Sequence, residues 1–226
     1  MKRPIIALLA TLLAGSLAGN NVFADTPDNE PSDYSCAPVY FGRNWAGRAL
    51  TIEGNGTVGI RELALAVAKA YSNNGFATDM TIDFFSRTPP ALPSGDEAEE
   101  TDFADYQPRK GYLAIGSMGD GDFITYCFWK RNNGHLLLAV QWTKEVDCGG
   151  HVLVFYDYSP NMQLLTPDTQ LTRRFERKYG RRRPDTEPHG LYSVIALLPS
   201  NGKDITVINP DTNDESIARF NGYDFD

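Results

Sequence analysis

The sequence contains few of the residues from which metal centres and disulfide frameworks are built. It has three cysteines and three histidines in 226 residues. Three cysteines form at most one internal disulfide, so the chain is not a small scaffold held together by several bridges. The histidines His135, His151 and His189 do not show the close spacing of a zinc site. We therefore expect no metal and no other cofactor.

Long apolar runs are missing after the first 24 residues, which excludes a later membrane helix of about 20 residues. The first segment differs, because Lys2 and Arg3 precede an apolar run from Ile5 to Leu17 and the segment closes at Ala24. This order is typical of a cleavable signal peptide, and it predicts export to the periplasm or the extracellular space. Asn20 stands where a lipid-anchored protein would carry cysteine, so we expect no lipid anchor and no stable membrane insertion.

Basic side chains and catalytic motifs are also scarce. The chain has 21 Lys and Arg against 29 Asp and Glu, a formal net charge of −8. This balance disfavours non-specific binding to nucleic acid over the whole surface, so we expect no nucleic-acid partner. A Gly-rich phosphate loop and the Gly-x-Ser-x-Gly turn of serine hydrolases are both absent. The sequence therefore favours a noncatalytic protein.

Asn-Gly pairs divide the second half of the chain into short segments rich in aromatic and aliphatic residues. Such pairs suit tight hairpin turns, and Asn133-Gly134 and Asn201-Gly202 each separate two strand candidates. The sequence predicts an antiparallel meander of these strands: Tyr112–Met118, Phe123–Lys130, His135–Thr143, Val152–Tyr158, Gln163–Leu165, Leu191–Leu198 and Asp204–Ile208. Because both faces of the segment from Phe123 to Trp129 are apolar, we expect cover on both sides of the sheet.

Helical spacing of apolar residues marks the segment from Ile60 to Tyr71, with Thr57 as a candidate N-cap. A second, shorter helix is predicted from Thr169 to Tyr179. The segment Thr88–Asp105 is rich in proline and acidic residues and is predicted to be a mobile loop. We therefore predict a single α+β domain over residues 25–226, in which an antiparallel meander of about six or seven strands packs against one main amphipathic helix.

The hairpin register constrains how the cysteines pair. If Asn133-Gly134 forms a two-residue turn, Cys127 lies opposite Val140, and Cys148 lies beyond the end of that ladder. The two cysteines would then be roughly 17 Å apart along the strands, too far for a disulfide. We expect Cys127 to be a buried free thiol and Cys36–Cys148 to be the candidate disulfide.

One segment of this acidic chain is strongly basic. Residues with equal charge recur there at i, i+4 spacing on the predicted helix, which is unfavourable unless an anion lies between them. The cluster consists of Arg173, Arg174, Arg177, Lys178, Arg181, Arg182 and Arg183. It indicates a site for a phosphate, a sulfated or uronic polysaccharide, or an acidic loop of a protein. The alternative interpretation is a solvated helix end, where cations are favoured.

Three further interpretations stay open. Cys148 and His151 share one tight turn, which fits a secreted cysteine hydrolase, and a carboxylate-dependent hydrolase is a related alternative. An exposed strand edge would suit a structural or assembly component. Exposed aromatic rings would suit a sugar or lipid groove, although such residues on consecutive strands are more commonly core. The aromatic candidates are Tyr126, Phe128, Trp129, Trp142, Phe155, Tyr156 and Tyr158.

The order of export signal, amphipathic helix and aromatic-rich meander resembles uncharacterised secreted proteins of the Bacteroidetes. The likeness is carried by the segment from His151 to Leu165, with Phe155-Tyr156-Asp157 followed by Leu164-Leu165. The resemblance implies secretion and brings no activity with it. We expect an exported noncatalytic binding protein, whose ligand lies either on an open face of the sheet or beside the arginine-rich segment.

Overall fold

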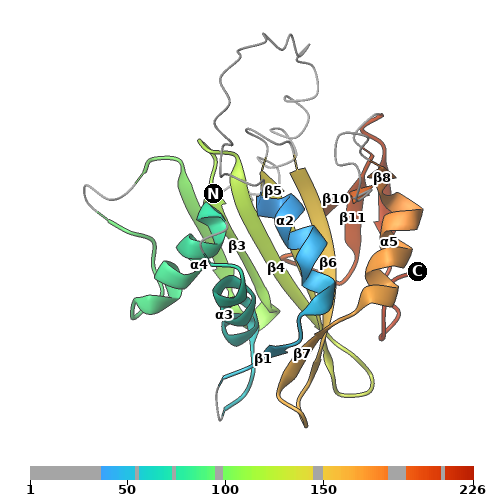
Figure 1. Ribbon diagram of the computed structural model, residues 1–226, viewed down its shortest axis with the longest axis horizontal. Coiled ribbons are helices and arrows are strands. Elements are labelled where there is room, and N and C mark those ends of the chain that lie inside the picture. The colour runs from blue at the N-terminus through green and yellow to red at the C-terminus, as the bar shows by residue number, and fades with distance from the viewer. Residues whose placement is uncertain are drawn as a thin grey trace.

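The computed structural model describes residues 37–53, 56–72, 75–94, 99–144, 150–182, 192–209 and 212–226. The predicted signal peptide lies outside these ranges. The centre of the protein is a seven-stranded antiparallel sheet in the order β1-β7-β6-β5-β4-β3-β2 (Figure 1). Its strands are β1 (Leu50–Thr51), β2 (Asp102–Gln107), β3 (Tyr112–Ser117), β4 (Asp122–Lys130), β5 (Leu136–Lys144), β6 (Gly150–Ser159) and β7 (Leu164–Pro167). From β2 to β7 each strand lies beside its neighbour in sequence, which confirms the antiparallel meander.

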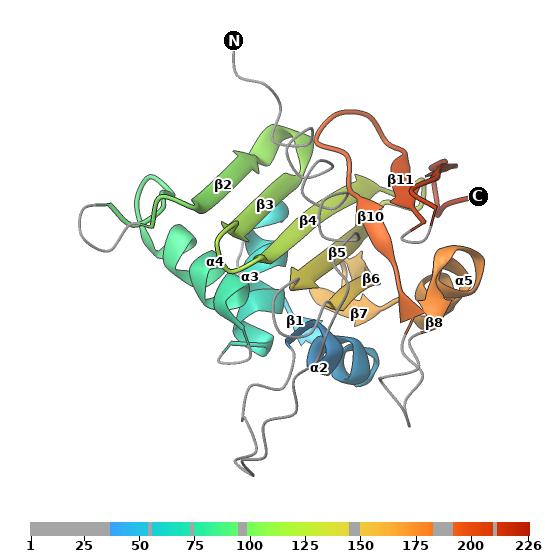
Figure 2. The ribbon, with the colours of Figure 1, turned by 90° about the horizontal axis from the view of Figure 1, so that it is seen from above.

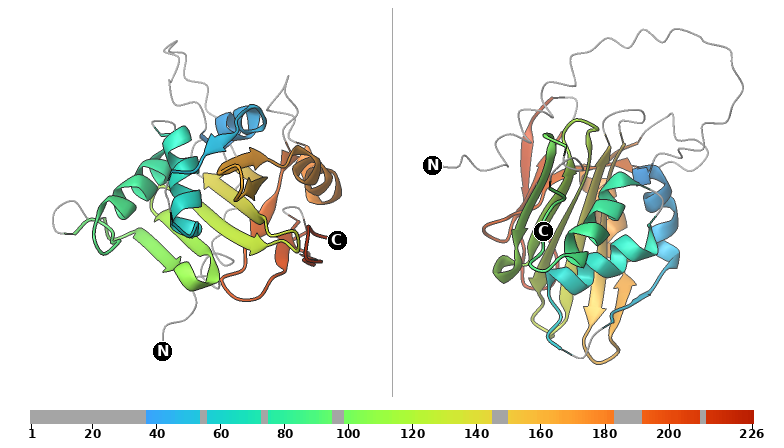
Figure 3. Two further views of the ribbon diagram at one scale, coloured as in Figure 1. Left: turned by 90° about the horizontal axis from the view of Figure 1, so that it is seen from below. Right: turned by 90° about the vertical axis from the view of Figure 1, so that its left-hand side faces the viewer.

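Both faces of this sheet are covered, as the apolar pattern of β4 predicted. One face packs on three helices, α2 (Ala37–Asn44), α3 (Ile60–Ala70) and α4 (Phe76–Ser86). The other face packs on α5 (Thr169–Tyr179) and on a second antiparallel sheet. That sheet contains β10 (Ile195–Leu197), β11 (Ile205–Ile208) and β12 (Glu215–Ala218). Figures 2 and 3 show the resulting layers, with the main sheet between α2–α4 and the second sheet.

Alternation along the strands separates the two cores. In β4, Ile124 and Tyr126 face α2–α4, whereas Cys127 and Trp129 face the second sheet and α5. This is the period-two pattern that a strand buried on both faces requires. The α+β class is therefore confirmed, but the prediction of one main helix is not, because the described residues form four α-helices.

The two helices that the sequence did not predict depend on packing. α2 contains proline, glycine and aromatic residues, which have weak intrinsic helix propensity. Its Phe41 ring meets Tyr71 edge-on, with ring centroids 4.8 Å apart. In α4, Phe84 and Phe85 both pack edge-on against Tyr106 of β2. Tertiary contacts stabilise these segments more than local preference does.

Helix α3 begins and ends close to its predicted bounds, but its cap differs. Gly59, rather than Thr57, is the N-cap, and the Glu62 carboxylate accepts the Gly59 backbone N–H at 2.8 Å. The N3 carboxylate satisfies one of the free N–H groups at the start of the segment. Helix α5 runs from Thr169 to Tyr179 as predicted.

Three predictions about strands and loops are corrected. The last two predicted strands do not continue the main sheet: they contain β10 and β11 of the second sheet, and residues 192–193 pair with residues 181–182. Helix α5, which follows β7, packs beside β6. The predicted loop Thr88–Asp105 overlaps a strand, since Asp102–Asp105 pair with β3. At the β4–β5 turn, Arg131 N–H donates to His135 O at 2.9 Å, and Gly134 adopts φ of 84°. This three-residue loop with one left-handed glycine shifts the register by one position.

The shifted register places Cys127 opposite Ala139 rather than Val140. Cys127 is nevertheless a free thiol and is buried, with 3% of its surface exposed. The prediction that Cys127 is a buried free thiol is confirmed. Cys36 and Cys148, the candidate disulfide, both lie outside the described residues.

Candidate functional site

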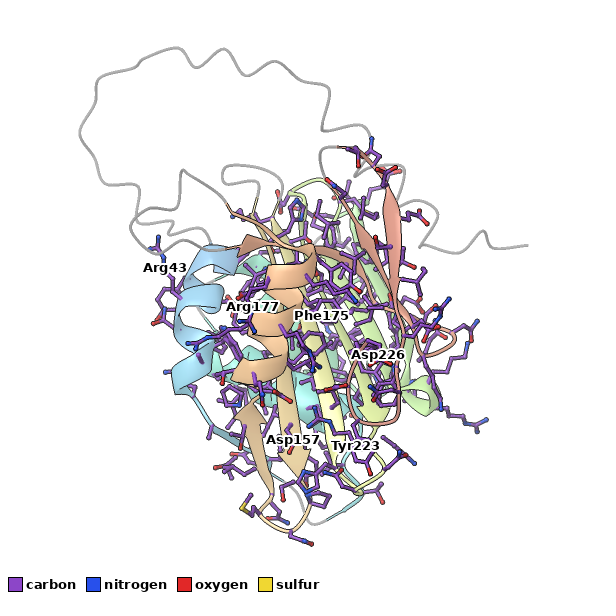
Figure 4. The ribbon with its side chains drawn as sticks, turned by 90° about the vertical axis from the view of Figure 1, so that its right-hand side faces the viewer. Arg43, Asp157, Phe175, Arg177, Tyr223 and Asp226 are labelled. Carbon is purple, nitrogen blue, oxygen red and sulfur yellow. The ribbon has the colours of Figure 1, made fainter. Side chains whose placement is uncertain are left out.

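The arginine-rich segment lies on α5, which Asp168 caps by accepting the Leu171 N–H at 3.0 Å. The helix buries one stripe against β6, formed by Leu171, Thr172 and Phe175. The opposite stripe is exposed and carries Arg173, Arg174, Arg177 and Lys178. Figure 4 shows Phe175 and Arg177 on opposite sides of α5. We call these four exposed residues the basic face of α5.

The four cations of the basic face differ in their partners. Arg174 forms an ion pair with Asp224, with Nη2 and Oδ2 2.6 Å apart. Arg177 donates from Nε to the backbone oxygen of Arg173 at 3.2 Å, which leaves its charge without an acid. Within the described ranges, the structure shows no carboxylate within 4.0 Å of the cationic groups of Arg173, Arg177 or Lys178. Three cations on one surface are therefore available to an anion.

The pKa values of two acidic residues next to the basic face, Glu176 and Asp224, are shifted in opposite directions. Burial raises the pKa of Glu176, and the nearby Arg173 only partly offsets this. Burial also acts to raise the pKa of Asp224, but hydrogen bonds from Arg174 and Asn221 outweigh it and leave that pKa lowered. The pKa values of these two carboxyl groups are thus shifted in opposite directions.

A shallow pocket of about 240 Å³ opens beside this face, where α5 meets the C-terminal residues. Its lining combines the cations Arg174 and Lys178, the rings of Tyr179 and Phe225, and the acidic residue Asp226. The Lys178 ammonium lies 4.9 Å from the centroid of the Tyr179 ring. The pocket thus places groups of both charge signs next to aromatic surface.

The remaining residues of the basic segment follow directly after α5. Arg181 and Arg182 form β8 (Arg181–Arg182) and pair with β9 (Tyr192–Ser193) through their backbones. Arg183 lies outside the described residues. The structure thus brings Arg173, Arg174, Arg177 and Lys178 together and continues the chain from them into an antiparallel pair.

The Cys148–His151 hypothesis falls partly outside the described residues, because Cys148 is among those not described. His151 lies in β6, with its Nδ1 atom 3.2 Å from the Thr143 hydroxyl.

The aromatic-groove interpretation is wrong, because six of the seven candidate rings are buried and the seventh, Phe128, is partly buried. Among the described residues, apolar side chains on both faces of the main sheet are covered by other elements.

One polar network escaped the sequence analysis. Arg131 forms ion pairs with Asp157 and with Asp168, the latter at 2.7 Å, and its Nε donates to the backbone oxygen of Tyr223 at 2.6 Å. His135 Nδ1 lies 2.6 Å from the other oxygen of Asp157. No local motif joins these residues, because only the pairing of β4, β5 and β6 brings them together. The network ties the β4–β5 turn to the start of α5 and to the C-terminal residues.

Comparison of the chain with models of known protein families, with curated proteins and with solved structures finds no match. Among the described residues, no helix has the length and apolar character needed to cross a membrane. The His, Cys, Asp and Glu side chains of the same ranges do not form a three-residue group that could hold a metal ion.

Proposed function

We propose that this protein is an exported, noncatalytic binding protein that takes an anionic ligand on the basic face of α5. Export rests on the signal-peptide pattern of the first 24 residues. The observation that carries the binding proposal is the presence of Arg173, Arg177 and Lys178 on one exposed surface without acidic partners among the described residues. Such a grouping repels itself and is relieved by an anion.

The geometry favours a ligand with repeated anionic groups. Arg173 and Arg177 stand one helical turn apart, so their Cβ atoms are about 6 Å from each other. Guanidinium groups bind sulfate, phosphate and carboxylate oxygens through two parallel hydrogen bonds. A sulfated or uronic polysaccharide presents such groups at intervals along a chain, and an acidic protein loop is the alternative partner of the same chemistry.

A direct test measures binding of a heparin oligosaccharide to the mature protein by calorimetry at low salt. We expect affinity to fall as salt is added, because exposed charges are screened over about 10 Å at 0.1 M. The double variant Arg173→Ala/Arg177→Ala is expected to bind more than about tenfold more weakly, since it loses two charge-assisted contacts. Restoration by Arg173→Lys/Arg177→Lys would be partial.

The matched control is Arg109→Ala/Lys110→Ala, which removes the same charge from two exposed neighbours in the turn η4 (Pro108–Lys110). If the control loses as much affinity as the α5 variant, the effect comes from net charge and the site is wrong. Absence of binding by the unaltered protein at low salt also rejects the proposal. Circular dichroism of each variant checks that α5 still forms.

A further inference from the structure

The short edge strand β1 presents unpaired backbone groups to one side. Ile52 N–H donates to Gln163 O at 3.0 Å, on the β7 side of the strand. Because backbone groups of a strand alternate in direction, the N–H and C=O of Thr51 point the other way, away from the sheet. None of the hydrogen bonds between described residues joins these two groups to another element.

The edge of β6 shows how the same fold closes a strand edge elsewhere. There, Asp168 N–H donates to Phe155 O at 2.8 Å, and Phe155 N–H donates to the Thr172 hydroxyl at 3.0 Å. Helix α5 thus satisfies the backbone groups that β7 leaves uncovered. Exposed strand edges are sites of pairing with other chains, and proteins usually cover them. β1 is different, because its outer edge faces a groove.

That groove, of about 510 Å³, lies between β1 and α3. Figures 1 and 2 show β1 next to α3, at the end of the main sheet that turns toward the helices. On the helix side the wall contains Leu65, Ala66 and Ala70, and on the strand side it contains Ala49. The alanines leave room for another backbone, and Leu65 offers apolar surface.

The groove contains one ion pair and two further charged side chains that bond to backbone groups. Lys69 on α3 pairs with Glu53 beyond β1 at 3.1 Å, which joins the two walls. Glu62 accepts the Gly59 N–H, and Arg61 donates to Phe85 O at 3.3 Å while lying over the Phe85 ring. Two acids and two bases line the groove, so it carries no surplus charge in an otherwise acidic protein. The equal number of acids and bases favours a bound segment that carries no net charge.

We propose that the groove between β1 and α3 binds an extended, uncharged peptide segment of a partner protein, which adds to the main sheet as a strand beside β1. Its backbone pairs with the outward N–H and C=O of Thr51, and alternate side chains contact Leu65 and Ala66. The Lys69–Glu53 pair swings aside at little cost, because both side chains are more than half exposed. This interaction is independent of anion binding on α5.

The test uses an acetylated and amidated peptide of about six alternating valine and threonine residues, titrated into the ¹⁵N-labelled mature protein. We expect amide shifts at Ala49, Thr51, Glu53 and Ala66, and slower exchange of the Thr51 amide proton. A peptide of six consecutive prolines is expected not to bind, because it has no backbone N–H groups that could pair with β1.

Two variants separate backbone pairing from other effects. Thr51→Pro removes the outward N–H and fixes φ, a change that edge strands tolerate, and we expect at least a tenfold loss of peptide affinity. Thr51→Val keeps the N–H and is expected to bind as the unaltered protein does. Ala66→Arg fills the groove from the helix side and provides a second loss-of-binding variant should Thr51→Pro fold poorly.

Each other outcome overturns the proposal. Unchanged binding by both Thr51→Pro and Ala66→Arg places the peptide elsewhere, as do shifts confined to β2 at the opposite edge. Sedimentation that shows a dimer without peptide, lost in Thr51→Pro, assigns the groove to a second copy of this chain. Absence of shifts at millimolar peptide rejects strand addition. Heparin binding by Thr51→Pro stays unchanged in every case, which keeps this test separate from that of α5.

Discussion

The hydroxyl group of Thr172 accepts the backbone N–H of Phe155 at 3.0 Å, and through this bond α5 closes the edge of β6. Both residues are fully buried, with Thr172 1% exposed. A side chain on a helix thus takes the place of a neighbouring strand. The bond satisfies a backbone group of β6 next to the end of the β6–β7 pairing, which covers residues 156–159.

The variant Thr172→Val tests this closure, because valine has the shape of threonine without the acceptor. The Phe155 N–H would be buried without a partner, and we expect a loss of about 1–3 kcal/mol in the free energy of unfolding. Thr172→Ser keeps the acceptor and is expected to lose less. Urea unfolding followed by fluorescence measures both. Equal stability of Thr172→Val and the unaltered protein would show that the bond contributes nothing.

Arg131 is expected to be the most sensitive charged residue among those described. Its side chain is 12% exposed and bridges Asp157 and Asp168. Arg131→Ala leaves two carboxylates that are mostly buried without their cation, so we expect a loss of about 2–4 kcal/mol. Lys130→Ala, at the exposed neighbour, should change stability by no more than about 0.5 kcal/mol. Thermal unfolding at low and high salt measures the stability of both variants. A similar loss of stability in Arg131→Ala and Lys130→Ala would contradict a stabilising role of the Arg131 network.

Two glycines offer a matched test of backbone geometry. A Cβ atom at Gly116 would collide with the backbones of Asp122 and Phe123 in the adjacent strand, whereas at Gly134, with φ of 84°, nothing lies within 4 Å. We expect Gly116→Ala to lose roughly 3 kcal/mol or more, because packed backbone must move. Gly134→Ala should lose only about 1 kcal/mol from the left-handed conformation. Chemical denaturation gives both values, and reversal of their order would refute the register of β3 and β4.

The Arg174–Asp224 pair predicts a small dependence of stability on pH. The folded protein lowers the pKa of Asp224 from its ordinary value of 3.8, so the pair contributes stability above that value and loses it as the pH falls through the lowered pKa. Because Arg174 is nearly half exposed, we expect no more than about 0.5 kcal/mol. Asp224→Asn should be less stable by that amount near neutral pH and indistinguishable in strong acid. A difference that persists in strong acid would point to a structural cause.

Cys127 is predicted to resist thiol reagents in the folded protein. It is buried, its Sγ lies 3.5 Å from the backbone oxygen of Pro199, and burial raises its pKa well above the usual range. The reactive thiolate is therefore scarce and inaccessible. Iodoacetamide labelling mapped by mass spectrometry should modify Cys127 only after denaturation. Rapid labelling under native conditions would show that this region opens.

The sequence determined much of the local structure. The bounds of α5 follow from the apolar pair Leu171 and Phe175 at i, i+4 spacing, and Asp168 adds a capping carboxylate. The two-sided apolar pattern of β4 predicted cover on both faces, because alternate residues must each find a core. These features depend on neighbours within a few residues, which is why sequence patterns report them.

Tertiary structure alone decided the features that join distant segments. Helices α2 and α4 form because Phe41, Phe84 and Phe85 pack on rings far away in the chain, which outweighs weak helix propensity. The Arg131 network and the β1–α3 groove exist only because the strand pairing brings their residues together. The basic residues of α5 were visible in the sequence, whereas the burial of its other stripe and the ion pair that holds Arg174 were set by packing against β6 and the C-terminal residues.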